Sequence, residues 1–227
     1  MAMQPGGLTS ISRRRAAAWL GMTVPTLALM GTSHAATPTQ LRFDVLRKGD
    51  RIGEHLLDFT PTAEGQRVAS HIELVIKVAF ITVYRYRQDG EDEWRRDVLA
   101  RTRIDTDDNG TTSHVAAELA ADRLRVEGPK GSFELAPGTM TDLSFWNLAI
   151  TTQRQLVDSQ TGEPIPVEVR PEASERVLVR GAEVAARRFA MSGSKSRSGT
   201  IWYDDTGRLV KAVVITRGEQ LDYELAG

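Results

Sequence analysis

Residues 68–86 read VASHIELVIKVAFITVYRY, and this stretch decides the fold class. Apolar and polar side chains alternate along most of it, as expected for a β-strand, whose successive side chains point to opposite faces of a sheet. Both alternating sets become apolar near Ala79, which predicts a bend in the strand at that point. We therefore expect one long strand with a single dry face. The side chains on that face are Val68, Ser70, Ile72, Leu74, Ile76, Val78 and Phe80.

The same alternation recurs along the chain on both sides of this stretch. Turn sequences such as Lys48-Gly49-Asp50, Asp89-Gly90 and Asp107-Asp108-Asn109-Gly110 separate the alternating runs. Many short strands without crossover helices predict an antiparallel meander that must curl to bury one face. The expected fold is all-β, as a curved sheet or half-barrel. Besides residues 68–86, strands are expected at 41–46, 52–59, 93–104, 111–119, 123–127, 132–135, 165–169, 176–179, 184–191, 199–203, 209–216 and 220–225.

Helical periodicity is sparse. The best candidate is residues 142–150, opened by Thr141 or Asp142 as a cap, and a second is residues 153–158. We expect one or two short helices that plug the open side of the sheet. No linker or repeat divides the rest of the chain, so residues 36–227 are expected to form a single antiparallel β domain.

The N-terminal 35 residues have the pattern of a cleavable export signal. Ser12-Arg13-Arg14-Arg15 is followed by an acid-free, mainly apolar stretch up to Gly31, which is shorter than the ~20 residues of a spanning helix. Small residues at Ser33 and Ala35 predict cleavage after Ala35. The arginine cluster resembles a twin-arginine signal, and the general secretory route remains the alternative. We therefore expect a periplasmic or secreted protein with no transmembrane span after cleavage.

Composition excludes several classes of protein. The 227 residues include no cysteine, which rules out disulfide staples, thiolate metal sites and cysteine nucleophiles. The formal net charge is -1, and removing the predicted signal would leave 26 basic against 30 acidic side chains. Such a mildly acidic chain is not suited to nucleic-acid binding.

Two hairpin motifs carry a resemblance to a known family. Residues 43–53 read FDVLRKGDRIG and residues 202–210 read WYDDTGRLV. In the second motif, the aspartate can bond the turn amides and Gly207 can supply a positive φ. With Glu93-Trp94 and Ser144-Phe145-Trp146, these motifs resemble a bacterial exported family known as domain of unknown function 6134. The resemblance implies a shape and an export route but no activity. More distantly, the meander is similar to the open-barrel lipoprotein carriers of the bacterial envelope, which hold acyl chains in an apolar hollow.

Large aromatic side chains are the candidate binding residues. If they point into the concave side of the sheet, they would form an apolar hollow suited to a lipid or another hydrophobic small molecule. Filling the core is the alternative role for the same side chains. The seven candidates are Phe43, Phe59, Phe80, Trp94, Phe145, Trp146 and Trp202.

Signals for catalysis and for metal binding are weak. His55, His71 and His114 are scattered over different expected strands without a metal-ligand motif. Residues 91–93, with the sequence EDE, are expected in a solvated acidic turn, and residues 105–110 resemble only part of a calcium loop. Motifs for a serine nucleophile or a phosphate loop are missing. We expect no catalytic residue, no metal and no cofactor.

Three classes of function remain open. The first is an exported protein that binds a lipid or other hydrophobic ligand in its concave sheet. The second is an envelope structural or interaction module that docks a protein partner through sheet edges or loops. The third is an exported hydrolase whose site only the fold assembles. Alternating strands also build outer-membrane barrels, but charges on both faces of several strands disfavour that class.

Overall fold

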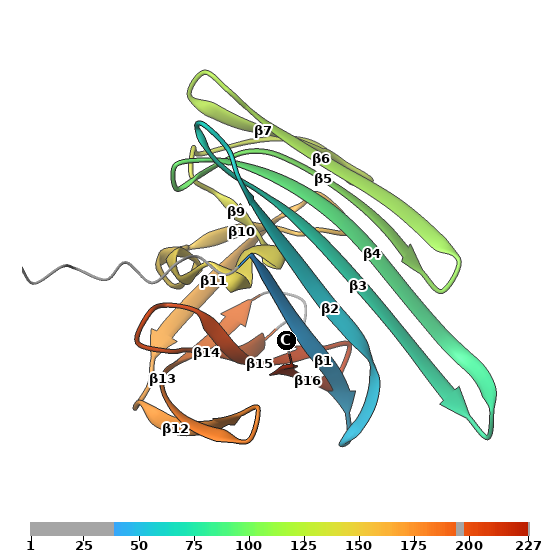
Figure 1. Ribbon diagram of the computed structural model, residues 1–227. Helices are drawn as coiled ribbons and strands as arrows, with labels where there is room; N and C mark the ends of the chain where they lie inside the picture. Colours follow the sequence, from blue (N-terminus) through green and yellow to red (C-terminus); the bar gives the residue numbers. More distant parts are fainter. Residues whose placement is uncertain (1–38, 194–197, 227) are drawn as a thin grey trace, which may run out of the picture. The chain divides into compact units, whose positions relative to one another are not determined.

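The computed structural model describes residues 39–193 and 198–226, most of which belong to one large β-sheet (Figure 1). The hydrogen-bonded order is β8-β7-β6-β5-β4-β3-β2-β1-β16-β15-β14-β13-β11-β10-β9, with β12 paired to β13. All pairs are antiparallel except β9 with β10. The strands are β1 (Gln40–Arg47), β2 (Asp50–Pro61), β3 (Gly65–Val78), β4 (Ile81–Arg95), β5 (Val98–Asp108), β6 (Thr111–Ala120), β7 (Arg123–Gly128), β8 (Gly131–Leu135), β9 (Met140–Thr141), β10 (Gln155–Val157), β11 (Pro164–Pro171), β12 (Glu175–Val179), β13 (Ala182–Gly193), β14 (Ser198–Tyr203), β15 (Leu209–Thr216) and β16 (Glu219–Leu225).

This architecture confirms the predicted all-β, mainly antiparallel fold. The sheet curls but does not close, because β8 and β9 end the order without pairing to each other. Strands β1 and β16 pair near its middle, so the two ends of the folded region meet there. The export signal predicted at residues 1–35 lies outside the described residues. Within the described part, no helix has the length and apolar character needed to cross a membrane.

Cross-strand register explains which side chains form the core. Phe43, His55, Ile72 and Gln88 lie opposite one another on four consecutive strands, and all four are buried. This row and its neighbours line the concave face of the sheet, as expected from strict alternation on paired strands. A second buried cluster, which includes Ile104, lies on β5 to β8 and is joined by Val157 of β10. The concave face therefore carries the core of the fold.

The stretch 68–86 is a hairpin, not the bent strand that its alternation predicted. β3 ends at Val78 and β4 begins at Ile81, with Ala79 and Phe80 in the turn at φ values of 47° and 74°. Two-residue hairpin turns usually carry Asn or Gly because both central residues need positive φ. Ala-Phe gives no such signal, so the prediction of a single strand was wrong at this turn.

Two neighbouring boundaries were also misplaced. Asp89-Gly90, predicted to form a turn, lies inside β4. Conversely, the strand expected at 93–104 is interrupted between β4 and β5, where Arg96 has a φ of 54°. In contrast, the turns at Lys48-Gly49-Asp50 and at Asp107-Asp108-Asn109-Gly110 connect strands as predicted.

The hairpin at Asp204-Asp205-Thr206-Gly207 forms as its residues predict. Asp204 Oδ1 accepts hydrogen bonds from the backbone N–H groups of Thr206 (3.0 Å) and Arg208 (2.9 Å). Gly207 supplies a φ of 85°. Burial alone would raise the pKa of Asp204, but the hydrogen bonds from Thr206 and Arg208 lower it overall.

The predicted short helix is present as two 3-10 helices, η1 (Asp142–Trp146) and η2 (Leu148–Thr152). Asn147 separates them in an extended conformation and caps η2, because its side chain accepts from the Ala149 N–H at 2.9 Å. The second predicted helix, residues 153–158, was wrong because this stretch contains β10, which pairs with β11 through Gln155–Val157.

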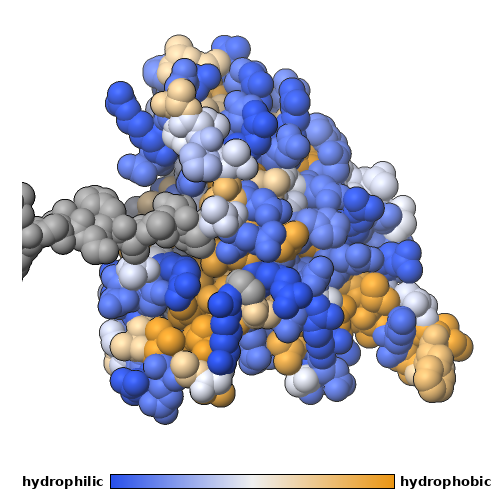
Figure 2. Space-filling view, viewed as in Figure 1, coloured by the Kyte–Doolittle hydropathy of each residue, from blue (hydrophilic) through white to orange (hydrophobic). Residues whose placement is uncertain are grey.

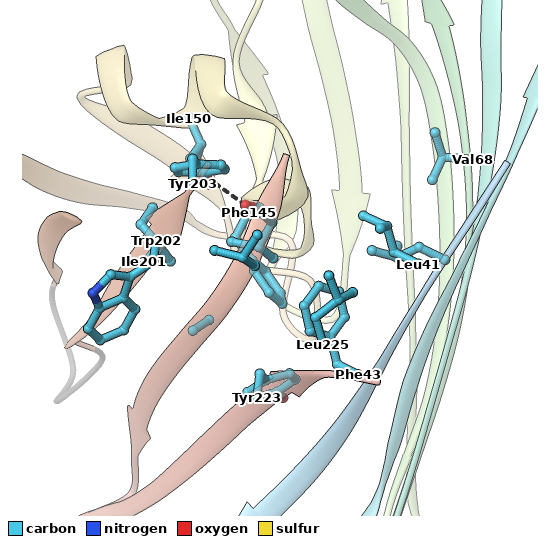
Figure 3. Packing of buried hydrophobic residues seen from close by; sticks show 14 of the residues in the cluster. Leu41, Phe43, Val68, Phe145, Ile150, Ile201, Trp202, Tyr203, Tyr223 and Leu225 are labelled. Carbon is cyan, nitrogen blue, oxygen red and sulfur yellow. Dashed lines mark hydrogen bonds between the residues drawn. The ribbon is translucent and has the colours of Figure 1, made fainter. Parts of the chain in front are cut away.

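Residues 139–163, which we call the plug segment, pack onto the concave face. The Tyr203 hydroxyl on β14 donates to the Phe145 carbonyl oxygen at 2.6 Å (Figure 3). We call β1 to β8 the N-terminal arm of the sheet and β11 to β16 the C-terminal arm. On the N-terminal arm, Gln88 Nε2 donates to Ser159 Oγ at 3.2 Å and Gln160 Nε2 donates to the Tyr86 hydroxyl at 3.1 Å. The plug segment is thus hydrogen-bonded to both arms.

We predict that Tyr203→Phe destabilises the fold without changing it. The variant keeps the ring but leaves the buried Phe145 carbonyl without this donor, which typically costs about 1–2 kcal/mol. Chemical denaturation should show a decrease of this size in the free energy of unfolding. An unchanged value would mean that this hydrogen bond does not hold the plug segment to β14.

Candidate functional site

The structure brings five of the seven candidate aromatic residues to the concave side. Phe43, Phe59, Trp94 and Phe145 are buried, and Trp146 is half-buried against the same cluster. Three come from the sheet and two from η1 of the plug segment. Alternation along β1, β2 and β4 directs the three sheet residues to this side, where the plug segment covers them.

Around Trp146, three aromatic rings form a tight group. The Trp146 ring centroid lies 5.0 Å from that of Phe59 and 5.5 Å from that of Trp94, with interplanar angles of 76° and 78°. Edge-to-face pairs at such distances stabilise an apolar cluster beyond simple burial. Trp146 therefore anchors η1 to β2 and β4.

A second aromatic group surrounds a histidine. The His55 ring centroid lies 5.5 Å from that of Phe145, 6.0 Å from that of Tyr223 and 6.4 Å from that of Phe43. His55 is fully buried, and neither ring nitrogen has a hydrogen-bond partner among the described residues. Burial lowers the pKa of His55 to about 3, with a further lowering from His71. The imidazole is therefore neutral at ordinary pH.

Asp92 is a buried carboxyl group, whereas the sequence placed it in a solvated acidic turn. It lies inside β4 and is 8% exposed, because its register directs the side chain to the concave face. Burial raises the pKa of Asp92 to about 6, although the Thr102 hydroxyl donates to Oδ1 at 2.5 Å and lowers it in part. The nearby Trp94 indole N–H also lowers the pKa of Asp92, although it does not form a hydrogen bond with the carboxyl group.

The other two candidates lie away from this group. Phe80 is 98% exposed in the turn between β3 and β4. Trp202 is buried on the opposite face of β14 from Tyr203 (Figure 3). Its Nε1 donates to Glu175 at 2.6 Å. Arg188 and Lys211 lie over its ring at 5.5 Å and 5.4 Å from the centroid. Trp202 thus packs under β12 and does not face the concave side.

Beside the plugged core, the concave face of the C-terminal arm carries a half-buried apolar strip of Met191, Val214 and Leu221, which we call the concave strip. Met191 pairs with Gly199, Gly199 with Val214 and Val214 with Leu221. Gly199 lets the backbone of β15 approach closely, because a Cβ atom there would clash with the Val213 carbonyl oxygen. The strip contains no aromatic residue, so the aromatic pattern did not indicate it, although alternation in 209–216 and 220–225 could have done so.

Two histidine–aspartate pairs lie on the opposite, convex face of the sheet. His71 Nδ1 and Asp89 are 2.6 Å apart, and His114 Nδ1 and Asp105 are 2.8 Å apart. Ser70 precedes His71 in β3, so its side chain points to the other face and cannot complete a nucleophilic triad with that pair. Among the residues that the structure describes, no three His, Asp or Glu side chains gather as metal ligands.

The partial calcium loop at residues 105–110 is a hairpin turn whose carboxylates face different partners. Asp107 Oδ1 accepts from the Gly110 N–H at 2.7 Å, and Asp105 pairs with His114. Asp108 accepts from the Tyr84 hydroxyl at 2.8 Å and from Arg217 at 2.5 Å. These contacts connect β4 and β5 to the β15–β16 turn across the concave side, which gives the acidic residues a structural role.

The fold and its covered concave face define an open, plugged, β-barrel-like protein, and comparisons with known proteins agree. A family model described as a domain of unknown function (DUF6134) matches residues 43–226. The chain belongs to this family, which confirms the resemblance seen in the sequence.

A solved structure shows the same kind of fold. The chain is similar to the crystal structure of a beta-barrel-like protein of domain of unknown function DUF1849 from Brucella abortus, with a TM-score of 0.57 and 10% sequence identity. The match covers 82% of this chain and 94% of the other. At this identity the likeness extends to the fold alone. No curated protein matches the sequence.

We predict that His55 makes the fold acid-sensitive. Its pKa drops from 6.5 when unfolded to about 3 when folded, so the unfolded chain takes up the proton first as pH falls. The free energy of unfolding should fall by about 3 kcal/mol from this group between about pH 7 and pH 4. Urea denaturation should show a weaker pH dependence for His55→Leu. His114→Leu, which removes an exposed histidine, should keep the wild-type dependence; equal curves for all three proteins would contradict the prediction.

Asp92 should act with the opposite sign. Its pKa rises from 3.8 when unfolded to about 6 when folded, so its stabilising effect is complete below pH 3.8 and disappears as pH rises through 6. The free energy of unfolding of Asp92→Asn should therefore rise by about 2–3 kcal/mol relative to that of wild type between about pH 4 and pH 8. Glu91→Gln, which alters the neighbouring exposed carboxylate, is the matched control and should show no such gain. A constant difference between Asp92→Asn and wild type would contradict the assigned pKa.

Proposed function

We propose that this protein is exported to the bacterial periplasm or beyond and binds a lipid or other apolar molecule on its concave face, without catalysing a reaction. Export is supported by the charged, apolar and small-residue order of residues 12–35. Binding is supported above all by the concave strip, whose apolar side chains stay half-exposed beside the buried core.

The strip adjoins the aromatic residues of the plugged core. In the next cross-strand row, Ile201, Ala212 and Tyr223 lie opposite one another, and Tyr223 contacts Phe145 at 5.7 Å between ring centroids. A ligand on the strip would remove its apolar surface from water, which contributes about 25 cal/mol per Å². It would also touch the edge of the aromatic group, so Phe43 and Phe145 would form the inner wall of the site.

The plug segment sets how deep such a ligand can reach. Its Trp146 ring packs against Phe59 and Trp94 and covers them. A ligand therefore gains access to these rings only if the plug segment shifts, whereas the concave strip is open without rearrangement. In this proposal the strip is the first contact, and the covered aromatic residues are an extension of the site.

The two alternative classes have weaker support. As an end strand, β8 could pair with a partner protein, but it is only five residues long and carries Glu134, features that discourage edge pairing. A hydrolase would need a nucleophile beside one of the His–Asp pairs, and Ser70 faces away from His71. The concave strip therefore favours binding of an apolar ligand over these two classes.

The test is binding of a fluorescent fatty acid, cis-parinaric acid, to purified variants. Val214→Asp places a charge in the concave strip and should weaken binding about tenfold or more. Ile215→Asp is the matched control, because Ile215 is the next residue along β15 and faces the opposite side of the sheet. Equal binding by both variants and wild type, or no binding by wild type, would refute the site.

Export is tested separately by intact mass. Protein recovered from the periplasm or medium of the bacterial host should have the mass of residues 36–227. Native mass spectrometry of the same material should show a copurified lipid-sized adduct that Val214→Asp reduces.

A further inference from the structure

One hairpin extends beyond the rest of the sheet. β3 pairs with β2 only as far as Leu74, and β4 pairs with β5 only from Tyr86 onward. Residues 75–84 therefore have no strand partner outside this hairpin, although the Arg85 carbonyl oxygen at its base accepts from the Asn109 N–H at 2.8 Å. We call residues 75–85 the β3–β4 ribbon. Figure 1 shows it projecting past the neighbouring turns. At about 3.3 Å per residue, each of its strands extends roughly 13–16 Å beyond the sheet.

The end of the ribbon is apolar and exposed. The exposed fractions are 98% for Phe80, 69% for Ile81, 59% for Val78 and 51% for Val83. These four residues make up most of the large hydrophobic side chains that are exposed in the described part of the chain. Figure 2 shows them as an orange projection at the lower right. Apolar side chains gathered at one tip indicate an interaction site.

Charge distinguishes the ribbon from the rest of the protein. From Leu74 to Gln88 the chain carries three basic residues, Lys77, Arg85 and Arg87, and no acidic one, although acidic residues outnumber basic ones in the whole chain. Lys77 and Arg85 are exposed and flank the apolar tip, one on each strand, whereas the hydroxyl groups of Tyr84 and Tyr86 are hydrogen-bonded to Asp108 and Gln160. An apolar tip flanked by exposed basic side chains has the polarity order of segments that enter the membrane interface.

The Ala79-Phe80 sequence does not favour the conformation of this turn. Ala79 and Phe80 both adopt positive φ, which costs stability for a non-glycine residue. Asn-Gly would form the same turn without this cost. The strained turn nevertheless places a phenylalanine at the most exposed point of the ribbon.

We propose that the β3–β4 ribbon inserts its tip, Val78 to Val83, into the surface of a lipid bilayer that contains anionic head groups. Phe80 and Ile81 would enter the acyl region, while Lys77 and Arg85 would contact lipid phosphates. A bilayer fits a projecting apolar tip better than a protein groove does, because basic residues accompany the tip on both strands and match the negative surface potential of anionic lipid.

The test is flotation of the purified protein with vesicles of phosphatidylethanolamine and phosphatidylglycerol, compared with phosphatidylcholine alone. Wild type should float with the anionic vesicles, and Phe80→Asp should lower the partition coefficient about tenfold or more. Leu178→Asp is the matched control, because Leu178 is 71% exposed on a different hairpin, and should bind as wild type does. The double variant Lys77→Glu, Arg85→Glu should lose the preference for anionic lipid.

Insertion can be located directly because the chain has no cysteine. A single cysteine in Phe80→Cys, labelled with an environment-sensitive fluorophore, should shift to the blue on adding anionic vesicles, whereas labelled Leu178→Cys should not. Wild type that stays unbound, or Phe80→Asp that floats as well as wild type, would overturn the proposal. Val214→Asp, which impairs the proposed fatty-acid site, should still float, so failure of either proposal can be recognised separately.

Discussion

A curved sheet that does not close must keep its concave face dry, and contact between this face and the plug segment does so here. Phe145 and Trp146 of η1 enter two separate aromatic groups, one around His55 and one with Phe59 and Trp94. Hydrogen bonds from Tyr203 and from Gln88 connect the plug segment to both arms of the sheet. The plug segment therefore covers part of the apolar face of both arms.

Two titratable groups are buried beneath the plug segment, and their charged forms are both disfavoured. His55 has its pKa lowered and Asp92 has its pKa raised, in each case chiefly by burial. Protonation of His55 therefore destabilises the fold, whereas protonation of Asp92 stabilises it. Such buried polar groups sometimes mark an active site, but here the two lie in different parts of the core, His55 among aromatic rings and Asp92 against the Thr102 hydroxyl.

The proposed functions use two surfaces that the plug segment leaves open. The concave strip on β13, β15 and β16 offers half-buried apolar side chains next to the core, and the β3–β4 ribbon offers fully exposed ones away from it. An apolar ligand and a membrane surface are related chemically, so a protein that touches a bilayer through one surface could exchange lipid through the other. The two surfaces lie on different strands, so each can be altered without the other.

The fold class, the family and most strands follow from the sequence, because alternation with period two and the turns at Lys48-Gly49-Asp50 and Asp204–Gly207 are local properties. Five of the seven aromatic residues named from the sequence lie on the concave side, whereas Phe80 and Trp202 do not. At the Ala79-Phe80 turn, which has no turn residues, only the pairing of β3 with β4 shows where the chain reverses, and the stability of these paired strands must outweigh the strain. Likewise, Asp92 is buried opposite Thr102 only because β4 pairs with β5. Trp202 is covered on the other face of β14 only because the β12–β13 hairpin brings Glu175 to it. Facing follows from alternation along one strand, but burial depends on what packs against that face, and the plug segment reaches it from a distant part of the chain.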